Sequence, residues 1–448
     1  MNGLEGWRHP LTEARHRLGW SQDKLAVLLQ ARGLGTTRKT VTRWEHGVVP
    51  DAAAQAALCE LFGVTPDTAR QLGWPRWLPT GRIAAVADSW DHPGTISALS
   101  DVVEGALVDR RNFVVLTGAE LFLPVYAWRL SPGPWAAYQD DGRRQVSAAL
   151  VEDLERLVSI RRRMDDEHGG EPMLEMLHAD LRFVVDLLKH WSYNGDVGRR
   201  LHAVAGQFAE LAGWAASEAA RHAAAQQYYL AALRASAAAG DRALAVKVVH
   251  LMGDLASETG RLSDATQLMD VAVTEARATP ATVQALVLAA AGRAHAKAGN
   301  APAARQALND ANSSLGRAVD GDAPAWAYWV DQTRITAWTG RALFSLGDYP
   351  GATRELAAAL EALGDSYPRT SAKWLGTTAA AQLRSGNVEA GCEFGRRAVD
   401  LLFSGQVHSA PALALLKSFR QELSAYEGAE AAREFAAYSS ARLGELHS

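Results

Sequence analysis

The stretch TTRKTVTRWEHG, Thr36–Gly47, concentrates three cations and one tryptophan within about three helical turns. Thr36 or Thr37 can cap a helix here, because a threonine hydroxyl accepts a hydrogen bond from a free backbone N–H of the first turn. The sequence predicts that this helix begins at Arg38, runs to about His46 and is ended by Gly47. The segments on either side of it indicate what such a basic helix does.

The predicted helix has two faces. Val41 and Trp44 lie three residues apart and can face inward together. The cations then face outward, where arginine can pair with guanine and threonine can contact the methyl group of thymine in a DNA major groove. The residues predicted to contact DNA are Gln22, Lys24, Thr37, Arg38, Lys39, Thr40, Thr42 and Arg43. The alternative is a solvated basic helix without a nucleic-acid partner.

The neighbouring segments also carry helical patterns. Ser21 is a natural N-cap, and Leu25, Leu28 and Leu29 then fall on one face. The further helices expected in this region span residues 11–20, 21–32, 51–62 and 66–72. A basic helix that follows a capped apolar helix favours DNA binding over a solvated surface helix.

Three motifs here resemble one known family. They are SQDKLA at 21–26, TVTRWEHG at 40–47 and LCELFGV at 58–64. In this order they resemble the Xre (lambda-repressor-type) helix-turn-helix domain over residues 10–72, although the turn QARGLGT is longer than the usual one. The resemblance implies a five-helix DNA-binding domain with Trp44 in its core. It also implies that Glu45 supports the turn or a partner side chain.

Composition is consistent with a soluble globular protein of two or three domains. The chain has 448 residues, of which 48% are hydrophobic and 21% are charged. Residues 1–80 carry a net charge of about +3 and the remainder about −7, which suggests that only the first part meets nucleic acid. No apolar run reaches the roughly 20 residues that a membrane helix needs. Cys59 and Cys392 are far apart in sequence, so a reducing cytoplasm is expected rather than a disulfide framework.

Between the two main parts, three segments have distinct compositions. Residues 73–81, GWPRWLPTG, predict a stiff spacer, so residues 73–170 are assigned to a linker and connecting segment. Residues 109–130 predict a buried apolar segment, either helix or strand, rather than an export signal. The acidic group at 165–168 predicts a solvated loop after a helix over 142–163, because adjacent helical side chains diverge too far to share a metal ion.

Small-residue turns recur through residues 171–448. They are centred on Gly213, Gly260, Gly299, Gly347, Gly386 and Gly428, at intervals of 39 to 48 residues. An alanine follows three of these glycines by five residues, and helical patterns lie between the turns. The pattern resembles tetratricopeptide (TPR) repeats over roughly 196–445. The resemblance implies an α-solenoid with a concave binding surface.

Aromatic residues are candidates for that surface. The segment PAWAYWVDQTR, 324–334, brings several of them close to two charged residues. The residues predicted to bind a ligand are Trp326, Tyr328, Trp329, Asp331, Arg334, Trp338 and Trp374. The alternative is that these rings pack between repeats, as large aromatics usually do.

The expected fold is therefore all-α: a five-helix helix-turn-helix domain at 1–72 and a TPR-like solenoid at 171–448. Its architecture resembles that of the peptide-sensing RRNPP regulators. The resemblance implies a homodimeric transcription regulator that binds an operator in double-stranded DNA and senses a peptide, small molecule or protein partner. An interaction scaffold without specific DNA binding is the alternative.

No phosphate loop, zinc motif or catalytic motif is present, so no cofactor, metal or enzymatic activity is predicted. The expected location is the cytoplasm, at the nucleoid when bound to DNA.

Overall fold

The fold is all-α, as predicted from the sequence. The computed structural model describes residues 10–62, 74, 78, 88–105, 115–131, 144–167, 170–364, 367–403 and 409–445. Across these residues the regular structure is helical, apart from one isolated bridge between Gln145 and Ser192. Among the described helices, none is both long and apolar enough to cross a membrane.

The chain divides into two compact units. The first comprises Met1–Ile83 with Gly105–Val115, and the second comprises Ala84–Glu104 with Leu116–Ser448. The sequence assigned residues 73–170 to a connecting segment, but the contacts place most of the described helices of that range in the second unit. Cys59 lies in the first unit and Cys392 in the second, and both are free, buried thiols.

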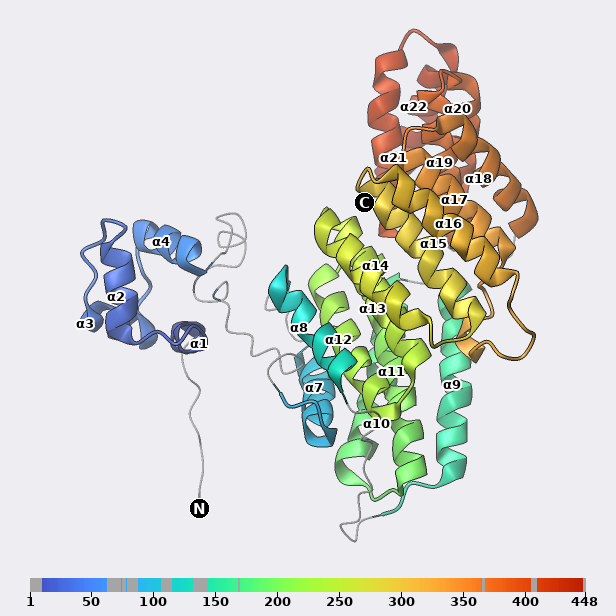
Figure 1. The fold of residues 1–448 in the computed structure, drawn as a ribbon. Coiled ribbons are helices and arrows are strands. Elements are labelled where there is room, and N and C mark those ends of the chain that lie inside the picture. Colours follow the sequence, from blue (N-terminus) through green and yellow to red (C-terminus); the bar gives the residue numbers. More distant parts are fainter. Residues whose placement is uncertain are drawn as a thin grey trace. The chain divides into compact units, whose positions relative to one another are not determined.

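The first unit has a core of its own, and its helices are labelled in Figure 1. Its described helices are α1 (Pro10–Arg17), α2 (Gln22–Gln30), α3 (Arg38–Glu45) and α4 (Ala52–Phe62). Val41 and Trp44 of α3 are buried among leucines from α1, α2 and α4, which confirms the predicted inward face. Leu78 is buried in the same cluster. The helix expected at 66–72 lies outside the described residues.

Caps determine where α2 and α3 begin. The Ser21 hydroxyl accepts a hydrogen bond from the Lys24 backbone N–H at 3.0 Å. The Thr37 hydroxyl accepts one from the Thr40 N–H at 3.3 Å, and the Thr40 hydroxyl accepts one from the Thr37 N–H at 3.4 Å. This reciprocal pair is a capping box, so Thr37 is the cap and Thr36 is buried instead.

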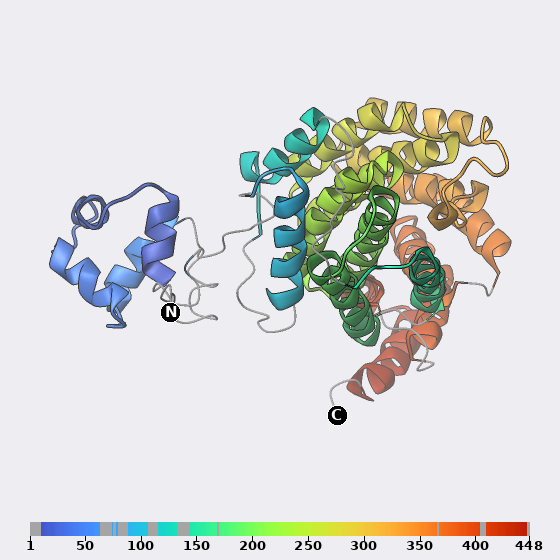
Figure 2. The same cartoon turned by 90° about the horizontal axis from the view of Figure 1, so that it is seen from below.

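The second unit is a succession of helices in which sequence neighbours pack together. Figure 2 shows those from α11 onward following one another around a curved stack. From α11 to α20 they form pairs joined by short turns: α11 with α12, α13 with α14, α15 with α16, α17 with α18 and α19 with α20. The bounds of the helices are α7 (His92–Gly105), α8 (Ala119–Leu130), α9 (Ala148–Glu167), α10 (Gly170–His190), α11 (Gly195–Glu218), α12 (His222–Ala239), α13 (Arg242–Glu258), α14 (Leu262–Ala276), α15 (Ala281–Lys297), α16 (Ala301–Leu315), η1 (Ala325–Ala327), α17 (Gln332–Ser345), α18 (Tyr349–Leu363), α19 (Pro368–Arg384), α20 (Val388–Phe403), α21 (Ala410–Leu423), η2 (Ser424–Tyr426) and α22 (Glu430–Glu445).

Glycine marks the point where the two helices of a pair approach most closely. A Cβ placed on Gly213 of α11 would lie 2.5 Å from the ring of Tyr229 on α12. One on Gly340 of α17 would lie 2.8 Å from the side chain of Leu356 on α18. Gly253 and Gly292 occupy the same position in the two pairs between them. The backbone carbonyl that faces each glycine belongs to an alanine, namely Ala225, Ala265, Ala304 or Ala352.

Gly213 is therefore not a turn residue, and this prediction was wrong. The turn after α11 is made by Ala220, whose φ of +58° lies in the left-handed region. Gly260 and Gly299 adopt the same conformation after α13 and α15, with φ of +79° each. A sequence search for turn glycines misses the turn after α11, because Ala220 and not a glycine adopts the left-handed conformation there.

Candidate functional site

Helix α3 of the first unit presents a basic, exposed face. Arg38, Lys39 and Arg43 are exposed, whereas Val41 and Trp44 on the opposite side are only 0% and 6% exposed. The helix is amphipathic in the way that the sequence predicted. Its charged side chains come from the first and second turns, just after the capping box.

Glu45 at the end of α3 fixes this helix to its neighbours. Arg15 of α1 donates from Nε to Glu45 Oε1 at 2.8 Å, and both side chains are buried. Gln22 at the start of α2 donates its side-chain amide to the other carboxylate oxygen. Glu45 therefore bridges three helices, which confirms the expectation that it supports a partner side chain. The orientation of α3 depends on this buried contact.

Gln22 is engaged within the unit. The Thr42 hydroxyl donates to Gln22 Oε1 at 3.2 Å, and Arg38 Nε donates to the same oxygen at 3.4 Å. Arg38 also lies 3.8 Å from Asp23, in an exposed pair that contributes little to stability. Of the predicted DNA-contacting residues, Lys24, Lys39 and Arg43 are exposed with no ion pair or side-chain hydrogen bond among the described residues.

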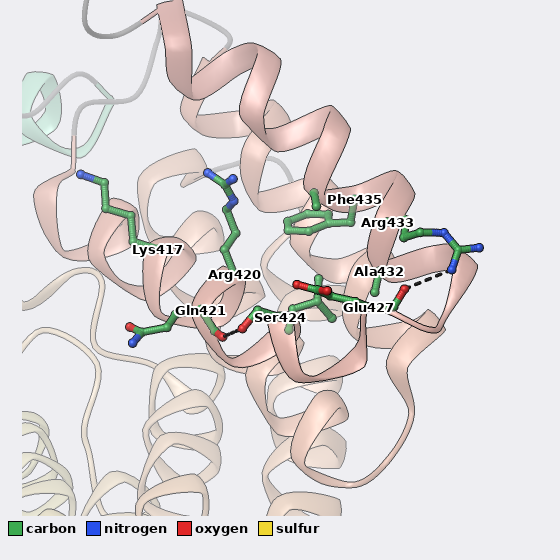
Figure 3. Close-up of a pocket in the computed structure, with 10 residues that line it drawn as sticks. Lys417, Arg420, Gln421, Ser424, Glu427, Ala432, Arg433 and Phe435 are labelled. Carbon is green, nitrogen blue, oxygen red and sulfur yellow. Dashed lines mark hydrogen bonds between the residues drawn. The ribbon is translucent and has the colours of Figure 1, made fainter.

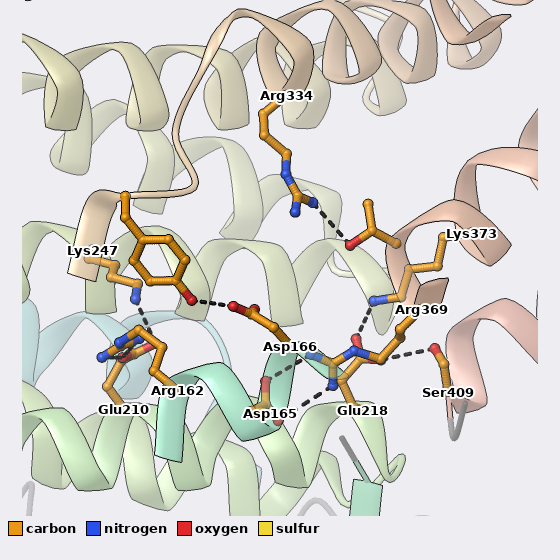
Figure 4. A network of polar contacts seen from close by, with 12 residues as sticks. Arg162, Asp165, Asp166, Glu210, Glu218, Lys247, Arg334, Arg369, Lys373 and Ser409 are labelled. Carbon is orange, nitrogen blue, oxygen red and sulfur yellow. Dashed lines mark hydrogen bonds and ion pairs between the residues drawn. The ribbon is translucent and has the colours of Figure 1, made fainter. Parts of the chain in front are cut away.

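The second unit contains a cavity of about 540 Å³ between its helices, called here the interior cavity, which is partly open to solvent. Figure 4 shows polar contacts made by some of its lining residues. Nearly all of its wall comes from α9, α21 and the first helix of each pair from α11 to α19. The second helices of these pairs contribute almost nothing to it. Its size falls within the range of pockets that bind small molecules.

Buried ion pairs form one side of this cavity. Glu210 of α11 accepts hydrogen bonds from Arg162 of α9 and Lys247 of α13, each at 3.0 Å. Burial opposes ionisation, but the two cations together hold the pKa of Glu210 below its usual range. Burial and the neighbouring Arg162 lower the pKa of Lys247 to about 8. The single Glu210 carboxylate therefore forms ion pairs with both Arg162 and Lys247.

The end of α9 contributes a second group of polar contacts to the wall of the cavity. Asp165 forms a buried ion pair with Arg369 of α19 at 2.8 Å, and the Tyr328 hydroxyl donates to Asp166 (Figure 4). The prediction of a solvated loop at 165–168 was therefore wrong for the residues described, because α9 continues to Glu167. His168 lies outside the described residues. The sequence showed a local acidic cluster but not a partner 204 positions away.

Further pairs complete the polar wall. Arg293 of α15 donates to both oxygens of Asp254 on α13, at 2.7 and 2.8 Å. Lys373 of α19 pairs with Glu218 of α11, which also accepts a hydrogen bond from Ser409 at 2.9 Å. These contacts join α13 to α15 and α11 to α19, and Asp254, Arg293 and Lys373 line the cavity.

Aromatic rings line the cavity between the charges. The guanidinium of Arg293 lies 4.3 Å from the ring centre of Trp338. That of Arg334 lies 4.8 Å from the ring centre of Tyr367 and 5.5 Å from that of Trp374. Such cation–π contacts hold the guanidinium groups in place without neutralising them.

The structure divides the predicted ligand-binding residues into two sets. Trp329, Arg334, Trp338 and Trp374 line the cavity. The other three do not. Trp326 is buried with Lys247 over its ring, Tyr328 binds Asp166, and Asp331 caps α17 by accepting from the Arg334 N–H at 2.8 Å.

Most of the charged lining was missed by sequence reasoning, although a signal for part of it exists. We call the glycine at the point of closest approach of two paired helices the crossing glycine. In each of four pairs, the residue directly after it faces the cavity. These residues are Trp214, Asp254, Arg293 and Arg341. Reading the position after the glycine, rather than the aromatic clusters, locates one wall residue in each of these pairs.

A second hollow, of about 660 Å³, lies near the end of the stack (Figure 3). Lys417, Arg420 and Arg433 surround it, with Phe435 among its lining residues. Arg433 donates to the backbone carbonyls of the turn before α22, and Arg420 donates to Ser440 at 2.8 Å. Two of its three cations are therefore engaged in local contacts, so the interior cavity is the stronger candidate.

Among the described residues, no three His, Cys, Asp or Glu side chains are grouped so as to hold a metal ion. Comparison of the chain with protein-family models and with curated proteins finds no match. Any assignment of function consequently depends on the two sites themselves.

Proposed function

We propose that the protein is a sequence-specific DNA-binding transcription regulator, with an Xre-type helix-turn-helix domain in its first unit. The observation that supports this most directly is the amphipathic helix α3. It presents Arg38, Lys39 and Arg43 to solvent, while its other face is buried and Glu45 fixes its orientation. Arginine and lysine on such a helix can bind base edges and phosphates in a major groove.

The second unit is proposed to be a TPR-like sensor that also mediates dimerisation. Four of its helix pairs are closed by a glycine–alanine contact, and these pairs together with the interior cavity are consistent with a helical repeat stack that holds a ligand. A homodimer would place two copies of α3 on half-sites about one helical turn of DNA apart, which multiplies affinity and specificity.

The test begins with in-vitro selection of DNA sequences by the purified full-length protein. The expected result is an enriched motif with two spaced half-sites, bound with an affinity that falls steeply as salt concentration rises. The absence of an enriched motif, at any salt concentration that permits binding, would favour the alternative of a TPR protein-interaction scaffold.

Substitutions in α3 test the assigned face. Arg38→Ala and Arg43→Ala are each expected to weaken operator binding by roughly 5- to 150-fold, the effect of losing a base contact worth about 1–3 kcal/mol. Arg32→Ala is the control, because Arg32 is an exposed cation of the same unit that lies outside α3. Unchanged affinity in both α3 variants, or an equal loss in the control, contradicts the assignment.

A further inference from the structure

The interior cavity carries more positive than negative charge. Eight arginine and lysine side chains line it, against five aspartates and glutamates. Arg162, Lys247, Arg293, Arg369 and Lys373 each form an ion pair with a carboxylate. Within the described part of the chain the other three, Arg334, Arg341 and Lys297, form none.

Arg341 is the least satisfied of these three cations. Arg334 donates to the Thr370 hydroxyl at 3.0 Å and Lys297 donates to a backbone carbonyl, whereas the guanidinium of Arg341 has no hydrogen-bond partner among the described residues. It extends from α17 toward the cavity, in the position directly after the crossing glycine Gly340. Arg341 is half-buried, and a bound anion would give its guanidinium the partner that the described residues do not supply.

The electrostatic surroundings of Arg341 strengthen this argument. Burial and the nearby Arg293 lower the pKa of its guanidinium to about 10. Asp254 and Glu258 attract it, but neither lies within ion-pair distance. Asp254 is already bound by Arg293, and burial together with Asp254 raises the pKa of Glu258. The carboxylates of the protein therefore leave positive charge in the cavity uncompensated.

The rest of the wall indicates an organic ligand. Trp214, Trp329, Trp338 and Trp374 line the cavity, and α21 adds small apolar side chains. Tryptophan rings offer flat surfaces on which a planar group can stack. A volume of about 540 Å³ fits a small molecule that carries such a group in addition to its charge.

We infer that this cavity binds a small organic anion, a carboxylate or phosphate with a planar apolar part, through Arg341 and Arg334 with Lys297 at the rim. The anion lies between the first helices of three successive pairs, α15, α17 and α19, while its planar part contacts the tryptophans. That such a ligand regulates DNA binding depends on the proposed function, but the binding itself does not.

The test uses the full-length protein and two fluorescent probes. Anilinonaphthalene sulfonate carries an anionic group on an aromatic frame, and phenylnaphthylamine has the same frame without the charge. Arg341→Met is expected to weaken binding of the sulfonate by about tenfold to hundredfold, the size of one charged hydrogen bond, and to leave the neutral probe nearly unaffected. Equal affinity of wild type and variant for the sulfonate, or equal losses for both probes, overturns the inference.

Two further variants make the test specific. Arg305→Met removes an exposed arginine of α16 outside the cavity lining and is expected to change neither affinity. Arg334→Met provides a second cavity variant if Arg341→Met does not fold, and it is judged by the same two probes. Circular dichroism of each variant verifies that the probes report on the folded protein.

Competition distinguishes the two kinds of anion. Displacement of the sulfonate from wild type by pyrophosphate indicates a phosphate ligand, and displacement by benzoate indicates a carboxylate. Displacement by neither at millimolar concentration contradicts the inference. The probe measurements contain no DNA, so they test the anion site independently of the regulator proposal. If the protein selects no operator but binds the sulfonate through Arg341, only the regulator proposal is refuted.

Discussion

At the scale of single residues, two histidines in the second unit are buried and held in the neutral form. His178 shares a hydrogen bond with the Tyr228 hydroxyl at 2.8 Å, and His202 shares one with the Gly198 carbonyl at 2.7 Å. Burial lowers the pKa of both imidazoles to about 4. Burial disfavours the charged imidazolium at both positions, so acid weakens the folded state through both residues.

Stability is therefore expected to fall between neutral pH and pH 4. The unfolded chain protonates each histidine near its usual pKa of about 6.5, whereas the folded chain does so near 4. In this window the unfolded state binds more protons, so the free energy of unfolding decreases as pH falls, by at most about 1.4 kcal/mol per pH unit for each histidine. Urea unfolding at pH 7 and pH 5 measures the difference. His202→Asn, whose amide can still donate to Gly198, should reduce that difference, and an unaltered pH dependence contradicts the assignment.

Individual residues also limit what the sequence could predict. Caps and apolar spacing are local, so Ser21, Val41 and Trp44 could be assigned correctly from their neighbours alone. The charged cavity could not, because Glu210 and Asp165 bind cations 37 or more positions away. Sequence reasoning favoured tryptophans for the ligand site, and only part of that set faces the cavity.

At the scale of helices, each pair is held close by the absence of a side chain at its crossing point. Gly340 faces the Ala352 carbonyl and the side chain of Leu356, and its counterparts repeat this contact in three other pairs. The turn glycines and the alanines that follow them were visible in the sequence as a repeat. The crossing glycines were not recognised, and Gly213 was assigned to a turn, since a glycine inside a helix carries no local sign of what packs against it.

Gly340→Ala is expected to destabilise the second unit by about 1–3 kcal/mol. The added Cβ would lie 2.8 Å from the Leu356 side chain and 3.1 Å from its backbone nitrogen, so the two helices would have to separate. This outweighs the gain of up to about 1 kcal/mol that alanine brings inside a helix. Gly316→Ala is the matched control, because its nearest atom lies 3.6 Å away and its φ of −63° suits alanine. Chemical denaturation compares the two, and equal stability would rule out the close-contact explanation.

At the scale of the whole molecule, the two units have separate hydrophobic cores. The first core is the cluster around Leu25, Leu58 and Trp44, and the second unit has several clusters along its stack. Cores that share no residues can unfold separately. The all-α class and the presence of two parts followed from the sequence, because helical periodicity persists even where a boundary is unclear. The placement of α9 in the wall of the cavity did not, since it depends on contacts that span the second unit.

Scanning calorimetry of the full chain is accordingly expected to show two transitions. Trp44→Ala removes a nearly buried ring and should lower the first unit's transition by an amount equivalent to about 3–5 kcal/mol, without moving the other. Gly340→Ala should shift only the second unit's transition. A single transition that both substitutions move together would show that the units unfold as one.

The ion pair between Asp165 and Arg369 has a consequence for folding during synthesis of the protein on the ribosome. Its two partners are 204 positions apart. At about 5–20 residues per second, Arg369 leaves the ribosome roughly 10–40 seconds after Asp165. Throughout that interval Asp165 cannot form this ion pair. The wall of the interior cavity is thus completed only late in translation, and a nascent chain interrupted before α19 has the basic helix α3 but lacks the part of this wall that α19 and α21 supply.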